Sequence, residues 1–186
     1  SPNTATALLE TGFRIDSSIA SQRFDFFLSF GSKKKIKFLY APRLPYRTNR
    51  NNIFKRGQSN LVEIPPSATI FPFAGTSMRI MPKITGFHQK ILHLEAKLNR
   101  KPVVFIIHPN EIIDESNEPR TIKRRSDNFI AYVLSDLLRA KLKTRNLGEN
   151  ALPIYEKLIT YYIKKEYTFT TMQEYVCSNK GKISNL

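Results

Sequence analysis

The sequence predicts an α/β fold with a mainly parallel sheet, because helical and strand-like segments alternate along the chain. Apolar residues run without alternation from Val103 to Ile107, as in a parallel strand that is covered on both faces. Apolar residues recur at helical spacing in Gly86–Leu98, Asp127–Leu142 and Leu152–Ile163. Together these segments indicate a sheet with helices packed against it.

Shorter elements are predicted near both ends of the chain. Asn3 or Thr4 can cap a helix through Leu9, and Gly12 stands where a left-handed residue ends such a helix. Strands are expected at Phe13–Ile15, at Leu61–Ile64 and at Tyr167–Phe169. Thr171 and Glu174 have the spacing of a capping box, which predicts a last helix.

Length and composition favour one globular domain over residues 1–176, followed by a polar tail over 177–186. Residues 29–60 are expected to form a long, irregular, basic excursion. The single cysteine, Cys177, excludes an internal disulfide and a cysteine-based zinc site. The chain shows neither a signal peptide nor an apolar run of transmembrane length, which favours a cytoplasmic location.

The charge is strongly basic, with 30 Lys and Arg against 15 Asp and Glu, a formal net charge of +15. No acidic residue occurs between Asp25 and Glu63. Such an excess attracts nucleic acid, anionic lipid or acidic polysaccharide. The alternative is a solvated basic loop whose acidic counterparts lie elsewhere, and charge alone does not distinguish the two.

His108 is the best catalytic candidate among the three histidines. It ends the predicted strand before Pro109, and active sites of parallel α/β folds lie at the carboxyl ends of strands. An imidazole there suits general acid or base chemistry, whereas the alternative is a histidine that only caps the strand. His88 and His93, five residues apart, do not share a helix face and are expected at the surface or partly buried.

Acidic residues near two strand ends are the other candidates. Asp16 follows the first predicted strand and could orient a histidine, or it could simply form a turn with its own backbone. Glu111 and Asp114 are expected to organise the loop after His108, for instance by pairing with Arg120.

At these positions the chain resembles the polysaccharide deacetylases, a carbohydrate esterase family, in the branch with a long C-terminal extension. Phe105-Ile-Ile-His108-Pro109-Asn-Glu111-Ile, followed by Glu118-Pro119-Arg120, is similar to the family's Phe-x-x-His-Pro-Trp-Glu-Ile and Gln-Pro-Arg segments. Four further segments resemble the family's in the same order: residues 8–19, 61–67, 78–82 and 169–174.

The resemblance implies the C-terminal half of a distorted (β/α) barrel and roles for five residues. His108 would protonate the leaving amine, and Asp16 would tune His108. Ile106 would line the acetyl-methyl pocket, Pro2 would be the proline of an Arg-x-Pro element, and Asn110 stands where the family has Trp. The family's zinc or other divalent metal is held by an Asp and two His in an N-terminal half that this sequence is expected to lack.

The sequence therefore predicts part of an enzyme that hydrolyses acetyl groups, breaking a non-peptide C–N bond, on N-acetylated glycans. We expect this chain to be inactive by itself, since it carries no metal ligands of the family. One alternative is a non-enzymatic module that binds nucleic acid or another polyanion, using aromatic residues among the basic ones. Another is a degenerate fragment that assembles with a further subunit or with a second copy of itself.

Overall fold

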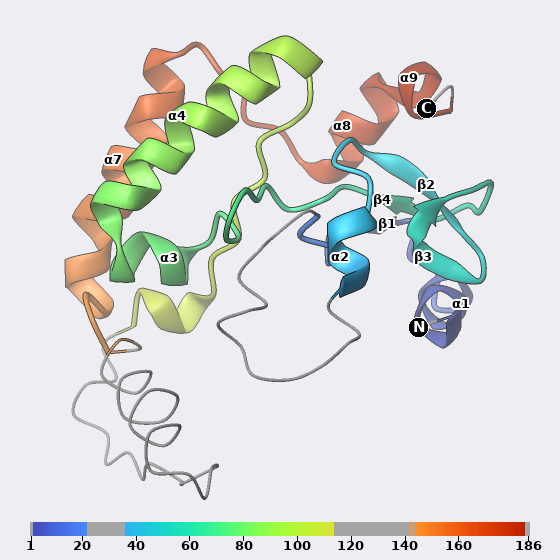
Figure 1. The fold of residues 1–186 in the computed structure, drawn as a ribbon, viewed down its shortest axis with the longest axis horizontal. Coiled ribbons are helices and arrows are strands. Elements are labelled where there is room, and N and C mark those ends of the chain that lie inside the picture. The colour runs from blue at the N-terminus through green and yellow to red at the C-terminus, as the bar shows by residue number, and fades with distance from the viewer. Residues whose placement is uncertain (1, 22–35, 114–141, 143, 185–186) are drawn as a thin grey trace, which may run out of the picture. The chain divides into compact units, whose positions relative to one another are not determined.

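A computed structural model of the chain describes residues 2–21, 36–113, 142 and 144–184 (Figure 1). The predicted helix Asp127–Leu142 therefore lies outside the described residues, apart from its last position. The chain forms two compact units. The first unit comprises Ser1–Phe73, His88–Phe105 and Thr168–Leu186, and the second comprises Ala74–Phe87 and Ile106–Tyr167.

The first unit is built on a small open sheet with the strand order β1-β4-β2-β3. Its strands are β1 (Ile15–Asp16), β2 (Tyr46–Asn49), β3 (Asn52–Arg56) and β4 (Val62–Glu63). β1 and β4 pair in parallel, and β2 pairs antiparallel with both β4 and β3. The sheet thus mixes both kinds of pairing, and its completion into a barrel stays a prediction.

Helices accompany this sheet at both ends of the chain. α1 (Pro2–Glu10) precedes β1, and Gly12 ends it at a φ of 89°, as expected of a left-handed residue. α2 (Lys37–Tyr40) lies between β1 and β2 along the chain. α8 (Met172–Ser178) and α9 (Lys180–Ser184) follow last, and the exposed Cys177 lies in α8.

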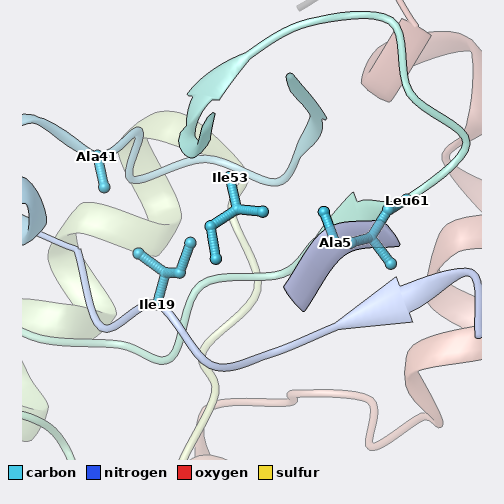
Figure 2. Close-up of a cluster of buried hydrophobic side chains, with 5 residues drawn as sticks. All are labelled: Ala5, Ile19, Ala41, Ile53 and Leu61. Carbon is cyan, nitrogen blue, oxygen red and sulfur yellow. The ribbon is translucent and has the colours of Figure 1, made fainter. Parts of the chain in front are cut away.

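The core of the first unit contains side chains that are distant in the sequence. One cluster joins α1 to the sheet, and Figure 2 shows its buried members, Ala5, Ile19, Ala41, Ile53 and Leu61. A second cluster packs α8 and α9 near β4, with Val62, Ile64 and Ile183 at its centre. Burial of these apolar groups is the main term that stabilises the unit.

The described part of the second unit consists mainly of helices. It contains α3 (Gly75–Ile80), the short 3-10 helices η3 (Pro109–Glu111) and η5 (Gly148–Ala151), and α7 (Leu152–Lys164). α4 (Pro82–Asn99) begins in this unit and continues into the first as one unbroken helix (Figure 1). The sequence predicts a single domain over residues 1–176, whereas the contacts divide the chain into two compact units; the single domain remains a prediction.

Three expectations about local structure are corrected. Tyr167–Phe169, predicted as a strand, follows α7 without strand structure. The described part of the predicted irregular excursion, residues 36–60, contains α2 and the β2–β3 hairpin. The side chain of Asn49 accepts a hydrogen bond from the Asn51 backbone N–H at 2.9 Å and shapes the hairpin turn. Val103–Ile107 is not a continuous strand, since it makes only one isolated parallel bridge, between Ile106 and Ala74.

Candidate functional site

His108 follows the point where two segments of the second unit meet. The backbone N–H of Gly75 donates to the Ile106 carbonyl at 2.7 Å, and this contact aligns the start of α3 with the chain that leads to His108. Pro109 then begins η3, because proline suits the first helical position. His108 is thereby the last extended residue before a tight turn.

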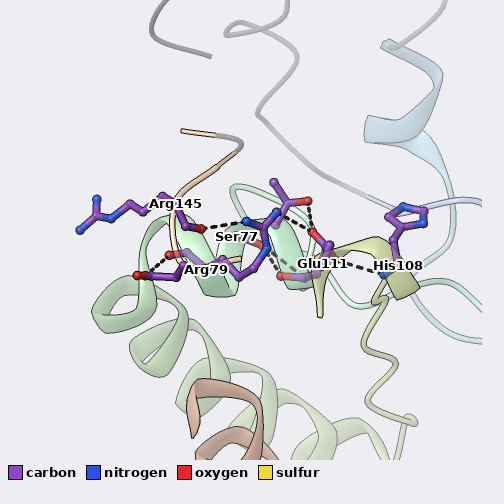
Figure 3. Close-up of polar contacts among 8 residues, drawn as sticks. Ser77, Arg79, His108, Glu111 and Arg145 are labelled. Atoms are coloured by element: carbon purple, nitrogen blue, oxygen red, sulfur yellow. Dashed lines mark hydrogen bonds and ion pairs between the residues drawn. The ribbon is translucent and has the colours of Figure 1, made fainter. Parts of the chain in front are cut away.

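A buried ion pair supports this turn from inside (Figure 3). Arg79 of α3 contacts Glu111 of η3 at 3.2 Å, and their side chains are only 4% and 5% exposed. Thr76 also donates to Glu111, at 2.5 Å. On its other side, Arg79 donates to the Arg145 carbonyl at 2.8 Å, and Asn146 donates to the Arg79 carbonyl at 2.8 Å.

Glu111 connects this ion pair to the backbone of His108. Its second carboxylate oxygen accepts the His108 N–H at 3.1 Å, and its own N–H donates to the His108 carbonyl at 2.9 Å. The backbone of His108 is therefore held on both sides, while its imidazole is exposed (Figure 3). Asn110 is also exposed, and Ile106 is half-buried.

A second polar cluster lies in the first unit, at the carboxyl ends of β1 and β4. Asp16 and Glu63 are register partners in the parallel pair. Glu63 is fully buried, and one of its oxygens accepts the backbone N–H groups of Ser18 and Ile19, at 3.1 and 2.8 Å. Asp16 accepts from the Ser17 N–H at 2.9 Å and from the Ser18 hydroxyl at 2.8 Å.

The carboxyl groups of Asp16 and Glu63 interact, and protonation of Glu63 favours this interaction. Burial first, and then the charge of Asp16 and a hydrogen bond between the two side chains, raise the pKa of Glu63 to about 8, against two backbone donors that lower it. Among the described residues, no N–H or O–H group donates a hydrogen bond to the other oxygen of Glu63. A protonated Glu63 donating to Asp16 satisfies that oxygen, because two ionised carboxylates in contact repel each other.

The candidate residues thus fall into two groups. Ile106, His108 and Asn110 lie in one short segment of the second unit. Asp16 lies in the first unit, and Pro2, which begins α1, lies there too. The structure shows Asp16 as a residue that shapes its own turn, and a link from Asp16 to His108 stays a prediction.

Two sequence-based expectations about other polar residues are revised. His88 is buried, with only 2% of its surface exposed, whereas His93 is partly buried as expected. Burial first, and then the positive charges of Arg43 and Lys101, lower the pKa of His88 to about 4. Glu111 does organise its loop, but through Arg79, while Asp114 and Arg120 lie outside the described residues.

Arg79 and Glu63 are the site residues that sequence reasoning missed. Both stand between apolar neighbours, Arg79 in Met-Arg-Ile and Glu63 in Val-Glu-Ile. A charged residue inside an apolar segment is rarely buried unless it has a partner, so such positions are a usable signal. The partners themselves are distant in the sequence and only the fold identifies them.

The residues that the structure describes do not fit a metal centre, since no three or more His, Cys, Asp and Glu residues gather there in an arrangement that could hold an ion. None of the helices described is both long and apolar enough to cross a membrane. No protein-family model, no curated protein and no solved structure matches the chain.

Proposed function

We propose that this chain is the C-terminal portion of a polysaccharide deacetylase-like hydrolase, in which His108 is the general acid. The observation that carries the proposal is the turn His108–Glu111, whose backbone is anchored by the buried Arg79–Glu111 pair while its imidazole is exposed. A catalytic acid requires this combination, because a fixed position lowers the entropic cost of proton transfer and exposure gives access to substrate.

The reaction assigned to His108 is the last proton transfer of amide hydrolysis. When the C–N bond of an N-acetylated sugar breaks, the nitrogen leaves as a poor, basic leaving group, and protonation by an imidazolium makes its departure feasible. Half-buried Ile106 offers an apolar contact for the acetyl methyl group on the same segment, and exposed Asn110 offers an amide for the sugar. The resemblance assigns the metal and the base to an N-terminal half, and the described residues hold no cluster for that metal.

The proposal is tested by expressing this chain joined to such an N-terminal half and replacing His108 by Ala. Loss of a well-placed general acid lowers turnover by roughly a hundredfold or more, so we expect a drop of that size in acetate release from a chito-oligosaccharide. His93→Ala is the matched control, since His93 is a partly buried histidine outside the His108 turn.

The comparison between the two variants decides the role of His108. We expect His93→Ala to retain activity within about twofold, because it leaves the proposed acid in place. If His108→Ala also stays within a few-fold of the parent, His108 is not the general acid and the proposed function loses its main support.

A further inference from the structure

α4 presents most of its large apolar residues to solvent and not to the core. Five large apolar side chains recur along it at intervals of three or four residues, and each is between 38% and 83% exposed: Ile84, Phe87, Ile91, Leu94 and Leu98. This set, the outer stripe, is about 21 Å long at 1.5 Å per residue. The sequence predicts the helix from this stripe, and a helix normally buries such a stripe.

The buried face of α4 is instead largely polar. Its buried residues, each at most 7% exposed, are Thr85, His88, Gln89, Leu92 and Ala96. The Thr85 hydroxyl donates to the Ser77 carbonyl at 2.9 Å, and His88 packs edge-on against the rings of Phe71 and Phe73. These contacts fix which face of the helix points inward, so the exposure of the outer stripe is a consequence of specific packing.

The charges beside the outer stripe are positive. Lys83, Lys90 and Lys97 are exposed and recur every seven residues, which places them in a row along one flank of the stripe. The acidic residue of α4, Glu95, is neutralised by Arg43 and Lys101, each at 2.6 Å. The exposed face of α4 therefore combines an apolar stripe with a basic flank.

We propose that the outer stripe of α4 docks onto an anionic lipid surface, with its apolar side chains in the interface and its lysines on the headgroups. A helix of this composition, apolar on one side and rich in lysine beside it, lies in the plane of a membrane surface instead of spanning it. The net charge of +15 adds a long-range attraction to the same surface. The proposal does not depend on the deacetylase activity proposed above.

A helical protein partner explains the same face less well. The apolar spacing of three and four residues also suits a coiled coil, but a second copy of α4 in antiparallel pairing would bring one lysine row against the other. Any other helical partner needs an acidic row at matching spacing. A lipid surface supplies both the apolar layer and the negative charge without a requirement for shape complementarity.

The test is sedimentation of the chain with vesicles of phosphatidylglycerol and phosphatidylcholine in equal parts, compared with phosphatidylcholine alone. We expect binding to the anionic vesicles only. Leu94→Ser and Leu98→Ser should each weaken it about tenfold, since each removes an inserted leucine side chain. Lys83→Gln, Lys90→Gln and Lys97→Gln should each weaken it about fivefold.

Exposed residues elsewhere supply matched controls for these variants. Ile70→Ser removes an apolar side chain that is 65% exposed, and Lys164→Gln removes an exposed lysine of α7. Both should bind the anionic vesicles within about twofold of the parent. Equal losses in the control and α4 variants, or no binding at all, would overturn the proposal.

A fluorescent probe tests the depth of the stripe independently, because the chain contains no tryptophan. Leu94→Trp should show a blue-shifted emission on adding anionic vesicles, whereas Ile70→Trp should not. Concentration-dependent dimers that disappear in Leu94→Ser would instead identify a second copy as the occupant and overturn the proposal.

Discussion

Glu63 occupies an environment that disfavours its charged form. It is fully buried and touches a second carboxyl group, Asp16, so that burial first and the neighbouring charge next raise its pKa to about 8 from 4.5. The protonated form is therefore the one that the folded state prefers. The backbone N–H groups of Ser18 and Ile19 donate to the other Glu63 oxygen and partly oppose this rise in the pKa.

We expect stability to fall as the pH rises through the titration of Glu63. The folded pKa lies above the unfolded one, so the stabilisation is complete below pH 4.5 and is lost progressively up to about pH 8. The loss amounts to a few kcal/mol. Glu63→Gln keeps the acceptor oxygen and removes the titration, and it should flatten this part of the pH profile in urea unfolding.

Glu10→Gln is the control for Glu63→Gln, since Glu10 is an exposed carboxylate at the end of α1 in the same unit. It should leave the slope between pH 4.5 and 8 unchanged. A Glu63→Gln variant that retains the slope of the parent would show that Glu63 is already ionised in the fold.

His88 has the opposite linkage to pH. Its ring packs against Phe71 at 4.8 Å and Phe73 at 5.5 Å between centroids, and neither ring nitrogen has a hydrogen-bond partner among the described residues. The faces of the phenyl rings can accept its N–H weakly. Burial therefore holds the imidazole neutral, with a pKa of about 4.

Acid should destabilise the protein through His88. Its folded pKa lies below the unfolded one, so the stabilisation is complete above pH 6.5 and is lost as the pH falls towards 4. The loss is at most about 3 kcal/mol. His88→Phe should remove this loss in thermal unfolding at mildly acidic pH, whereas His93→Phe, on the same helix, should not; equal behaviour of the two variants would contradict the assignment.

At the scale of elements, the approach of α3 to η3 depends on a missing side chain. A Cβ atom built on Gly75 would collide with the Glu111 carboxylate and crowd Ile107 at 3.1 Å. Glycine is required here by this close approach, and Gly75 has no positive φ. The absence of one methyl group thus allows the Arg79–Glu111 pair to form.

Gly75→Ala should therefore destabilise the protein by about 1–3 kcal/mol, the usual cost of overpacking a buried site. Gly86→Ala, inside α4, is the matched control because a Cβ there meets nothing within 4 Å. It should stabilise the protein by about 0.5–1 kcal/mol, since alanine favours a helix. Thermal unfolding of both variants checks the prediction, and two shifts of the same sign would contradict it.

Elements with strong local signals could be predicted from the sequence, and those that depend on distant partners could not. α7 matches the predicted helix, and α8 begins at the predicted capping box, in which Thr171 accepts from the Glu174 N–H at 3.2 Å. Both signals lie within one or two helical turns. Val103–Ile107 has the composition of a strand, but a ladder needs a neighbour, and the chain provides it one bridge.

The orientation of α4 illustrates the same limit within a predicted element. Periodicity locates the helix correctly, between Gly86 and Leu98, but it implies that the apolar stripe faces the core. The observed face is chosen by polar contacts of Thr85 and His88 with residues outside the helix. No pattern within the helix encodes those partners.

At the scale of the molecule, two of the buried titratable groups, Glu63 and His88, favour a mildly acidic optimum of stability. Glu63 lowers stability as the pH rises from 4.5 to 8, and His88 lowers it as the pH falls from 6.5 to 4. Their effects oppose each other between pH 4.5 and 6.5, which leaves a plateau in the contribution of these two groups. Both residues belong to the first unit, so the plateau applies to that unit.

The candidate site could be predicted in part at this scale. His108 was found from its place after an apolar segment, and its exposure agrees with that role. The support of the His108 turn by Arg79 could not be predicted, because Arg79 and His108 lie 29 positions apart along the chain and no periodic pattern connects them. Sequence patterns are local, whereas contacts between distant segments are a property of the folded chain.

Among the described residues the open sheet has two edges, and each discourages pairing with another chain in a different way. β3 forms one edge, and its exposed Lys55 and Arg56 discourage pairing with a neighbouring chain. β1 forms the other edge, with only two residues and no basic side chain. Both edges are therefore protected against growth of the sheet, β3 by its charge and β1 by its shortness, and a strand added beside the carboxyl pair Asp16–Glu63 would gain few backbone hydrogen bonds.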